Sequence, residues 1–234
     1  MFESGETISF AQGTSISAAT DSSPKAKGSM RALLIADIDP ELGQPLPNYI
    51  AAHDVDVLIT AGDLNAGLLQ GADQLHIPKI GVYGNHCNGR YLEELGITNL
   101  QGKKVTIGGL SFVGLQGCIR YKPDDVRFLY TQEEYEQMVA ELPPADVLVT
   151  HCPPRGINDH EDRAHVGITA LRSWIEQHRP ALVIHGHTYP DEPVTRYGAT
   201  EIAYVYGSRL LDLPSPAVHP QSPQTCSPSA SITG

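Results

Sequence analysis

The feature that most constrains the fold of this chain is a series of short apolar runs, each of which ends in a polar cluster. Short runs of this kind, bounded by turn residues, are typical of strands that are covered on both faces. We predict strands at 31–36, 55–60, 79–83, 147–150 and 181–184, and further strands at 105–107, 111–115 and 201–206.

Helical patterns lie between these runs. The segment 131–142 begins with Thr131 and has Glu134 three residues later, which is the sequence pattern of a capping box. The segment 168–178 carries apolar residues at helical spacing. The alternation of strands with helices predicts an α/β domain.

The two ends of the chain have a different composition from the middle. Residues 1–29 are rich in Ser, Thr, Gly and Ala without any period, and they are predicted to be either a disordered native tail or a leader left by cloning. Residues 213–234 carry repeated Ser-Pro and Gln-Pro steps and are predicted to be a second disordered tail. The predicted domain therefore spans residues 30–212.

The chain gives no sign of secretion or of a membrane span. It contains no apolar run near the roughly 20 residues that cross a bilayer, and its first residues lack the basic and apolar regions of a signal peptide. We therefore expect a cytoplasmic protein without membrane contact, with reduced thiols. Its widely spaced cysteines are Cys87, Cys118, Cys152 and Cys226.

Residues that commonly bind metals follow the predicted strands. Because the carboxyl ends of strands in an α/β sheet form one edge, where ligands bind, we expect these side chains to converge on one rim. In strand order they are Asp37 and Asp39, then Asp63, then Asn85 and His86, then His151, and finally His187.

These strand ends resemble the five blocks of the calcineurin-like metallophosphoesterase superfamily, which run DxH, GDxxD, GNH, a single His, and GHxH. The resemblance covers about residues 30–212 and implies a four-layer α-β-β-α sandwich with two central mixed sheets flanked by helices. The matching segments are Asp37-Ile38-Asp39, Gly62-Asp63-Leu64-Asn65-Ala66, Gly84-Asn85-His86-Cys87, Thr150-His151 and Gly186-His187-Thr188-Tyr189.

The resemblance also implies an activity and a metal site. It implies hydrolysis of a phosphodiester or phosphomonoester by attack of a metal-bound hydroxide, with two divalent cations, Mn first and Fe, Zn or Mg as alternatives. Asp63 would bridge the two cations, and Asn85, His151 and His187 would be the other ligands of one cation. His86 would contact the phosphate with Asn85 and protonate the leaving oxygen.

The second metal site departs from the family pattern. Asp39 replaces the His of DxH and Tyr189 replaces the last His of GHxH, so Asp37 and Asp63 are the remaining matches. Three outcomes stay open: an oxygen-rich site for Mn or Mg that uses Asp39 or Tyr189, a weak site filled with substrate, or a single-metal enzyme. His185 is an alternative ligand.

Two further segments offer substrate contacts. Arg120, in the loop after the strand 111–115, could hold a phosphate through its planar guanidinium or could be an ordinary surface residue. In the loop 151–160, Asn158, Asp159 and His160 could contact substrate or could stabilise the loop itself.

The net charge of −11 limits the class of substrate. An acidic surface without a basic stripe repels an extended nucleic acid, so a small phosphate ester is the expected substrate, with a diester slightly favoured. The alternative from another class is a degenerate family member that acts as a binding scaffold, which the loss of two imidazoles favours.

Overall fold

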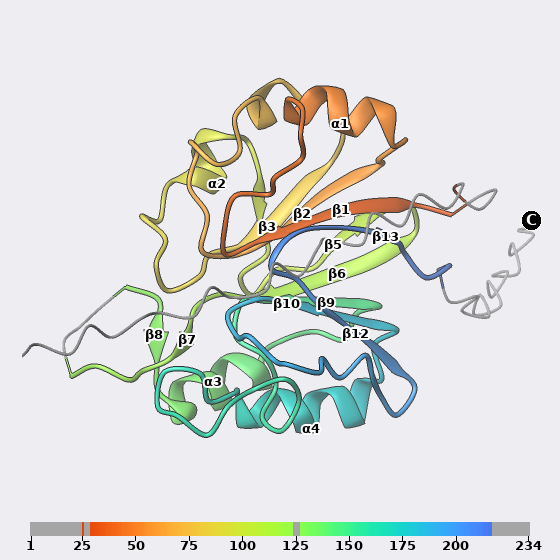
Figure 1. Ribbon diagram of the computed structural model, residues 1–234. Helices are drawn as coiled ribbons and strands as arrows, with labels where there is room; N and C mark the ends of the chain where they lie inside the picture. Colours follow the sequence, from red (N-terminus) through yellow and green to blue (C-terminus); the bar gives the residue numbers. More distant parts are fainter. Residues whose placement is uncertain (1–24, 26–28, 124–126, 217–234) are drawn as a thin grey trace, which may run out of the picture.

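The computed structural model describes residues 25, 29–123 and 127–216, and its strands form two large sheets (Figure 1). The first sheet has the order β13-β1-β2-β3-β4, with β13 Gly207–Asp212, β1 Arg31–Ala36, β2 Val57–Ala61, β3 Lys79–Val82 and β4 Thr98–Asn99. The second has the order β11-β12-β10-β9-β6-β5, with β11 Arg196–Tyr197, β12 Thr200–Tyr204, β10 Leu182–His185, β9 Val147–Thr150, β6 Leu110–Leu115 and β5 Val105–Ile107. A small pair joins β7 Cys118–Ile119 to β8 Leu129–Tyr130.

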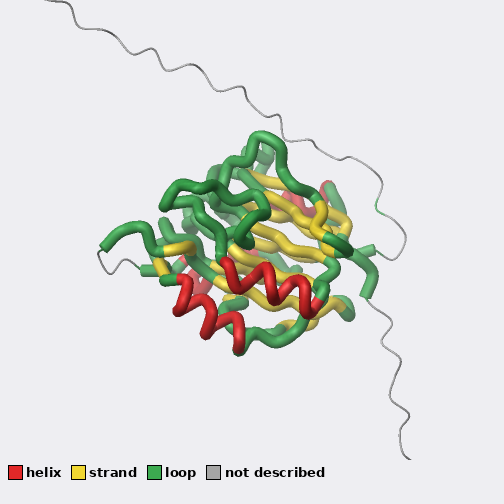
Figure 2. Tube along the Cα trace, turned by 90° about the horizontal axis from the view of Figure 1, so that it is seen from below, coloured by secondary structure: helices red, strands yellow, loops and turns green. Residues whose placement is uncertain are grey.

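Helices cover the outer faces of both sheets. In Figure 1, α1 and α2 lie above the first sheet and α3 and α4 lie below the second; Figure 2 shows the two longer helices side by side from below. This arrangement confirms the predicted four-layer sandwich. The helices are α1 Leu46–Ala52, α2 Tyr91–Glu94, α3 Gln132–Ala140 and α4 Thr169–His178, with a short 3-10 turn at Ala72–Gln74.

The layering follows from the two-residue period of buried strands. All six residues of β1 are buried: Leu33 and Ile35 pack with α1 and α2, while Leu34 packs between the sheets. The second sheet divides its side chains in the same way between the central layer and α3 and α4. Because each central strand is covered on both faces, the strands read as unbroken apolar runs in the sequence.

The six-residue strand β13 was not predicted. The predicted strand 201–206 ends at Tyr204, and the chain then crosses to the first sheet, where β13 pairs antiparallel with β1. The turn uses Gly207, whose φ of 78° glycine adopts readily and other residues adopt rarely. Most of β13 is only half-buried because the strand lies at a sheet edge, and its mixed composition gave no strand pattern.

Most of both predicted tails lies outside the described residues. Residue Leu213, which the prediction assigned to the second tail, is instead buried at 4% exposure, and its amide donates a hydrogen bond to the Met30 carbonyl at 2.8 Å. Cys87, Cys118 and Cys152 are buried free thiols, and Cys226 is outside the described part. In that described part, no helix has both the length and the apolar character that crossing a membrane requires.

The capping box of α3 gives a first prediction. Thr131 Oγ1 accepts a hydrogen bond from the Glu134 amide at 3.2 Å, and the Glu134 carboxylate accepts one from the Thr131 amide at 2.7 Å. Thr131→Ala should lower the free energy of unfolding by about 1 kcal/mol and the Tm by about 2–4 °C, measured by thermal unfolding. Thr169→Ala at the start of α4, whose cap residue makes no side-chain bond, is the control, and equal losses would contradict the prediction.

Candidate metal centre

Three of the predicted strand-end residues meet in one cluster. Asp63 follows β2, His151 follows β9 and His187 follows β10, and one potential ligand atom from each lies within 4.8 Å of the other two. His151 and His187 are buried and Asp63 is half-buried. Side chains from both sheets therefore face the same point, as the positions of the strand ends predicted.

His151 is oriented by a hydrogen bond on the side away from the cluster. Its Nδ1 donates to the Ala61 carbonyl at 2.8 Å, which turns Nε2 toward Asp63 Oδ2 at 3.2 Å and Asn85 Oδ1 at 3.1 Å. Burial lowers the pKa of His151, but attraction to Asp63 outweighs it and raises that pKa above its usual value. A nitrogen and two oxygens at such spacing match the ligand set of a divalent cation.

His187 offers its other ring nitrogen. Its Nε2 lies 2.8 Å from the Ala164 carbonyl, which can only accept, so the proton is on Nε2 and the Nδ1 lone pair is free for a ligand role. Burial, helped by repulsion from His151, lowers the pKa of His187 to about 3. The ring is therefore neutral, as a metal ligand must be.

Asp37 lies beside the cluster and is fixed by the backbone. Both of its carboxylate oxygens accept from the His187 amide at 3.1 Å, and burial raises its pKa to about 6, with Asp63 adding to the rise and His151 opposing it. A Cβ on Gly186 would lie 2.5 Å from Asp37 Oδ2, so only glycine lets the two segments approach. A half-buried carboxylate in this position favours a neighbouring cation.

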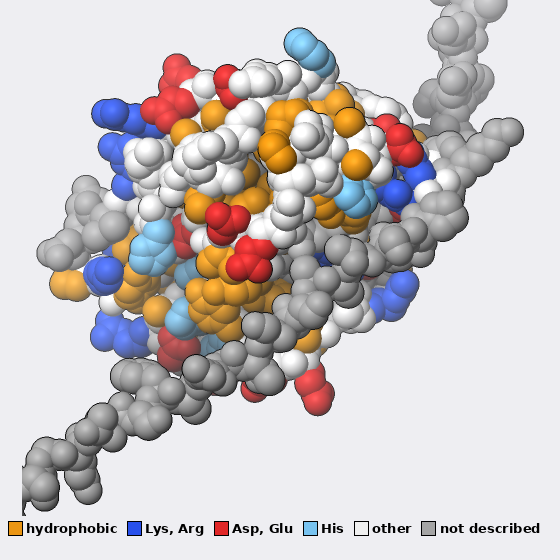
Figure 3. All heavy atoms as spheres, turned by 45° about the horizontal axis from the view of Figure 1, so that its top comes forward, with side chains coloured by type: hydrophobic (Ala, Val, Ile, Leu, Met, Phe, Trp, Pro, Cys, Tyr) orange, Lys and Arg blue, Asp and Glu red, His pale blue; other side chains and the backbone are white. Residues whose placement is uncertain are grey.

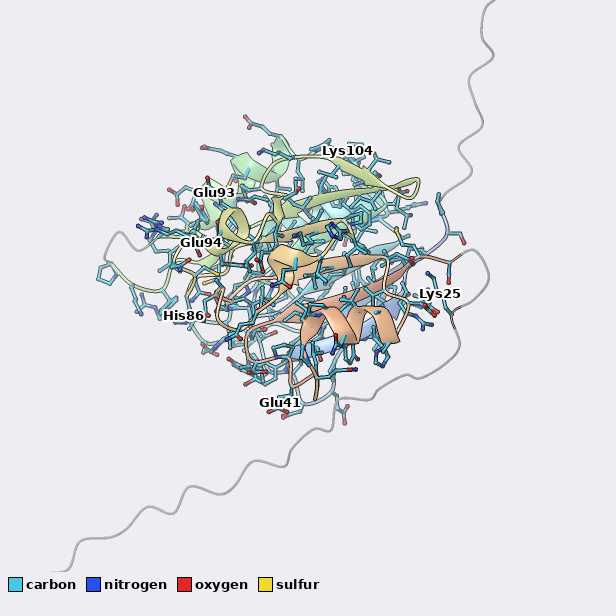
Figure 4. The ribbon with its side chains drawn as sticks, turned by 90° about the horizontal axis from the view of Figure 1, so that it is seen from above. Lys25, Glu41, His86, Glu93, Glu94 and Lys104 are labelled. Carbon is cyan, nitrogen blue, oxygen red and sulfur yellow. The ribbon has the colours of Figure 1, made fainter. Side chains whose placement is uncertain are left out.

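The third strand end supplies Asn85 and His86. Asn85 is buried with its Oδ1 on the cluster, whereas the His86 side chain is exposed at the left edge of the molecule in Figure 4, the side on which β1 ends. The His86 amide donates to Asp63 Oδ1 at 2.7 Å, which holds the loop against the metal cluster. Cys87 accepts from the Gly84 amide, and burial raises the pKa of its thiol to about 11, so it remains neutral.

The residues that depart from the family pattern lie outside the cluster of Asp63, His151 and His187. Asp39 is exposed, and its Oδ1 accepts from the Glu41 amide at 2.9 Å. Tyr189 is 54% exposed, and burial of the remainder raises its pKa. His185 donates from Nδ1 to the Gly186 carbonyl and accepts at Nε2 from Asn158, so both of its ring nitrogens are already engaged.

Three of the four substrate contacts predicted outside the motifs, Arg120, Asn158 and Asp159, are engaged within the protein itself, whereas the His160 ring lies 6.0 Å from that of His165. Arg120 donates to the Leu129 carbonyl at 3.0 Å and to Glu134 at 3.2 Å. Asn158 bonds to Val194 as well as to His185, and Asp159 accepts from Arg155, Gly156 and Gly167. These contacts favour the loop-stabilising interpretation for Asn158 and Asp159, and they occupy part of the Arg120 guanidinium.

Sequence reasoning missed His165. Its ring centroid lies 5.3 Å from that of His187 and 6.0 Å from that of Tyr189, and its Nδ1 lies 2.9 Å from Asp162 Oδ1. In Figure 3, histidine side chains adjoin apolar ones on the left of the molecule, the side on which β1 ends in Figure 1. His165 lies beyond the loop 151–160 in which substrate contacts were predicted, and the only sequence signal was the histidine itself.

Comparison with known proteins agrees with this geometry. Residues 30–191 match the family model described as calcineurin-like phosphoesterase, which confirms the resemblance inferred from the motifs. A UPF0046 protein of Caenorhabditis elegans is 30% identical over 215 residues, covering 76% of this chain and 70% of that protein. TT1561 of Thermus thermophilus aligns with a TM-score of 0.53 at 15% identity, covering 75% of this chain and 88% of that chain. A further solved structure aligns with a TM-score of 0.54 at 18% identity, covering 75% and 90%.

Proposed function

Because this chain belongs to the calcineurin-like phosphoesterase family, we propose that it is a metal-dependent hydrolase of small phosphate esters, with diesters slightly favoured over monoesters. The observation that carries the proposal is the convergence of Asp63 Oδ2 and Asn85 Oδ1 on His151 Nε2, with His187 in the same cluster. Both imidazoles are held from behind by backbone carbonyls, which is how ligand rings are oriented in metal sites.

The donor set fits a divalent cation of the Mn, Fe or Zn type, with Mn first. Two imidazole nitrogens and two oxygens suit these ions better than Ca, which takes oxygen ligands. When bound, such a cation supplies a nucleophile from water at neutral pH and neutralises charge on the phosphate oxygens. We propose that Asp63 and Asp37 would hold a second cation: burial raises the pKa of Asp37 to about 6, repulsion from Asp63 adds to the rise, and a cation there would offset both.

The residues of the chain would divide the remaining work. Asp63 would join the two halves of the site, since one oxygen faces His151 and the carboxylate lies close enough to Asp37 to raise its pKa. Asn85 orients the phosphate, and the exposed imidazole of His86 meets the leaving oxygen and donates the proton. The neutral Cys87 thiol gives His86 no anionic partner, so we expect its proton transfer to be less efficient than with a carboxylate there.

A small substrate is supported by the charge of the chain. The net charge of −11 makes long-range attraction of a polyanion unfavourable, and a cation at the centre would attract a single phosphate locally. Purified protein with Mn should hydrolyse bis-p-nitrophenyl phosphate, and the monoester more slowly, followed by release of nitrophenolate. Absence of turnover of both esters with Mn, Fe, Co, Zn and Mg would rule out the enzyme.

A scaffold without catalysis is the second candidate. The observation in its favour is that Asp39 uses its carboxylate in a local turn and Tyr189 is largely exposed, so the second half of the site has fewer fixed ligands. A scaffold would bind metal tightly without hydrolysing esters.

A further inference from the structure

We propose that His165, Tyr189 and Tyr206 form an aromatic rim that binds a planar aromatic group on the phosphate ester. This inference rests on the proposed function, because the rim acts on a phosphate held at the metal centre. It narrows the expected substrates to aryl or heteroaryl esters and gives the rim residues the role of specificity determinants. None of the three was singled out as a substrate contact by the motifs.

The exposed apolar side chains of the described residues gather around the metal centre. They are Ile38, Tyr189, Val194 and Tyr206, with exposures of 37%, 54%, 41% and 44%. Ile38 directly follows Asp37, and Tyr189 follows His187 by two positions. Val194 bonds to Asn158 in the loop that also carries His165. Exposed apolar groups that collect at one place on a protein mark a binding site, whereas single ones are ordinary.

Ring contacts link this apolar group to a metal ligand. The Tyr189 and Tyr206 centroids lie 5.2 Å apart at 81°, and Tyr189 and His165 lie 6.0 Å apart at 71°. His165 in turn lies 5.3 Å from His187. In an edge-to-face pair, one ring contacts the other with its edge only, so its two faces are not covered by that contact. Such ring faces can contact a planar ligand beside the bound phosphate.

The His165 side of the rim is held in place before any ligand binds. Asp162 accepts from His165 Nδ1 at 2.9 Å and also from the Ala164 and His165 amides, so the loop and the ring are fixed together. Tyr206 precedes Gly207, and the position of a Cβ there would be 3.7 Å from Ile38 Cγ1, so Ile38 supports this turn. Preformed aromatic surfaces bind planar groups without a large ordering cost.

A planar aromatic ester group matches this surface better than the alternatives do. Because the two tyrosine planes lie at 81°, one ring can stack on a planar group while the other contacts its edge, whereas an alkyl group offers no ring face. The rim is also continuous with the metal centre through His165 and His187, so one small molecule can reach both. We therefore expect the aromatic group to be carried on the phosphate itself.

The test compares three phosphonates, which bind a phosphate site without being hydrolysed. Binding of phenylphosphonate, cyclohexylphosphonate and methylphosphonate to the Mn-loaded full chain is measured by calorimetry. Phenylphosphonate should bind about tenfold more tightly than methylphosphonate, consistent with one good ring contact. Cyclohexylphosphonate, similar in size but not planar, should fall between them. Equal affinity of phenylphosphonate and methylphosphonate would overturn the proposed rim. Equal affinity is also the result expected if these residues bound a protein partner instead.

Tyrosine variants distinguish a contribution of the aromatic ring from a contribution of the phenol hydroxyl. Tyr189→Leu and Tyr206→Leu should each bring the phenyl to methyl ratio toward one with little change for methylphosphonate, while Tyr189→Phe should keep the ratio. Tyr197→Leu is the matched control, because Tyr197 pairs with Thr200 at the opposite end of β12 from Tyr206. A ratio that survives both leucine variants, or a Tyr189→Phe loss for all three ligands, would overturn the inference. If the wild-type protein binds none of them, the proposed function fails together with it.

Discussion

Asp63→Asn is expected to lower kcat/KM for bis-p-nitrophenyl phosphate by at least about a thousandfold while the protein stays folded. The substitution keeps an oxygen for the His86 amide but removes the charge that faces His151 and that would join two cations. Loss of a cation's stabilisation of the phosphate is worth several kcal/mol, and each 1.36 kcal/mol is about tenfold in rate.

The measurement needs a folding control and a charge control. Circular dichroism should show the same secondary structure in Asp63→Asn, since the side chain lies outside the strands. Asp73→Asn, which removes an equally negative but exposed side chain, should retain full activity. If Asp63→Asn turned over the ester within tenfold of the wild-type rate, the proposal that Asp63 bridges two cations would be wrong.

The positions of the buried strands could be predicted from the sequence, whereas most of the edge strands could not. Strands such as β1 and β9 are covered on both faces, so their apolar runs stand out from the surrounding chain. The edge strand β13 is half-buried and depends on long-range pairing with β1, which no local pattern reports. Pairs of two-residue strands such as β7 and β8 were missed for the same reason.

The ligand types at strand ends were predictable, while their exact orientation was not. Asp37, Asp63 and His187 all have positive φ, at 69°, 54° and 71°, a backbone conformation that residues other than glycine rarely adopt. This backbone turns the three side chains inward, and the strain is of the kind that concentrates at functional sites. Asp39 also follows β1, in place of the His of DxH, and was a candidate ligand, yet its carboxylate accepts from the Glu41 amide. A single-sequence pattern cannot distinguish these two outcomes.

His187→Ala is expected to weaken Mn binding by at least about a hundredfold, measured by titration calorimetry on the full chain. The variant deletes the neutral imidazole whose Nδ1 is left free by the hydrogen bond to Ala164, and even the loss of a group behind a ligand costs tenfold to a hundredfold. Phosphodiester hydrolysis should fall in parallel at low Mn and recover partly at high Mn, because Asp63, Asn85 and His151 remain.

The same variant distinguishes an enzyme from a scaffold, since metal binding is read independently of turnover. If the wild-type protein takes up Mn tightly and His187→Ala does not, but neither hydrolyses any ester, the scaffold is correct and the cluster is still a metal site. His76→Ala, which removes an exposed imidazole, should bind Mn like the wild-type protein. Unchanged Mn affinity in His187→Ala would show that the cation is held elsewhere, because a ligand fixed between Asp37 and Ala164 cannot be replaced by water without loss of affinity.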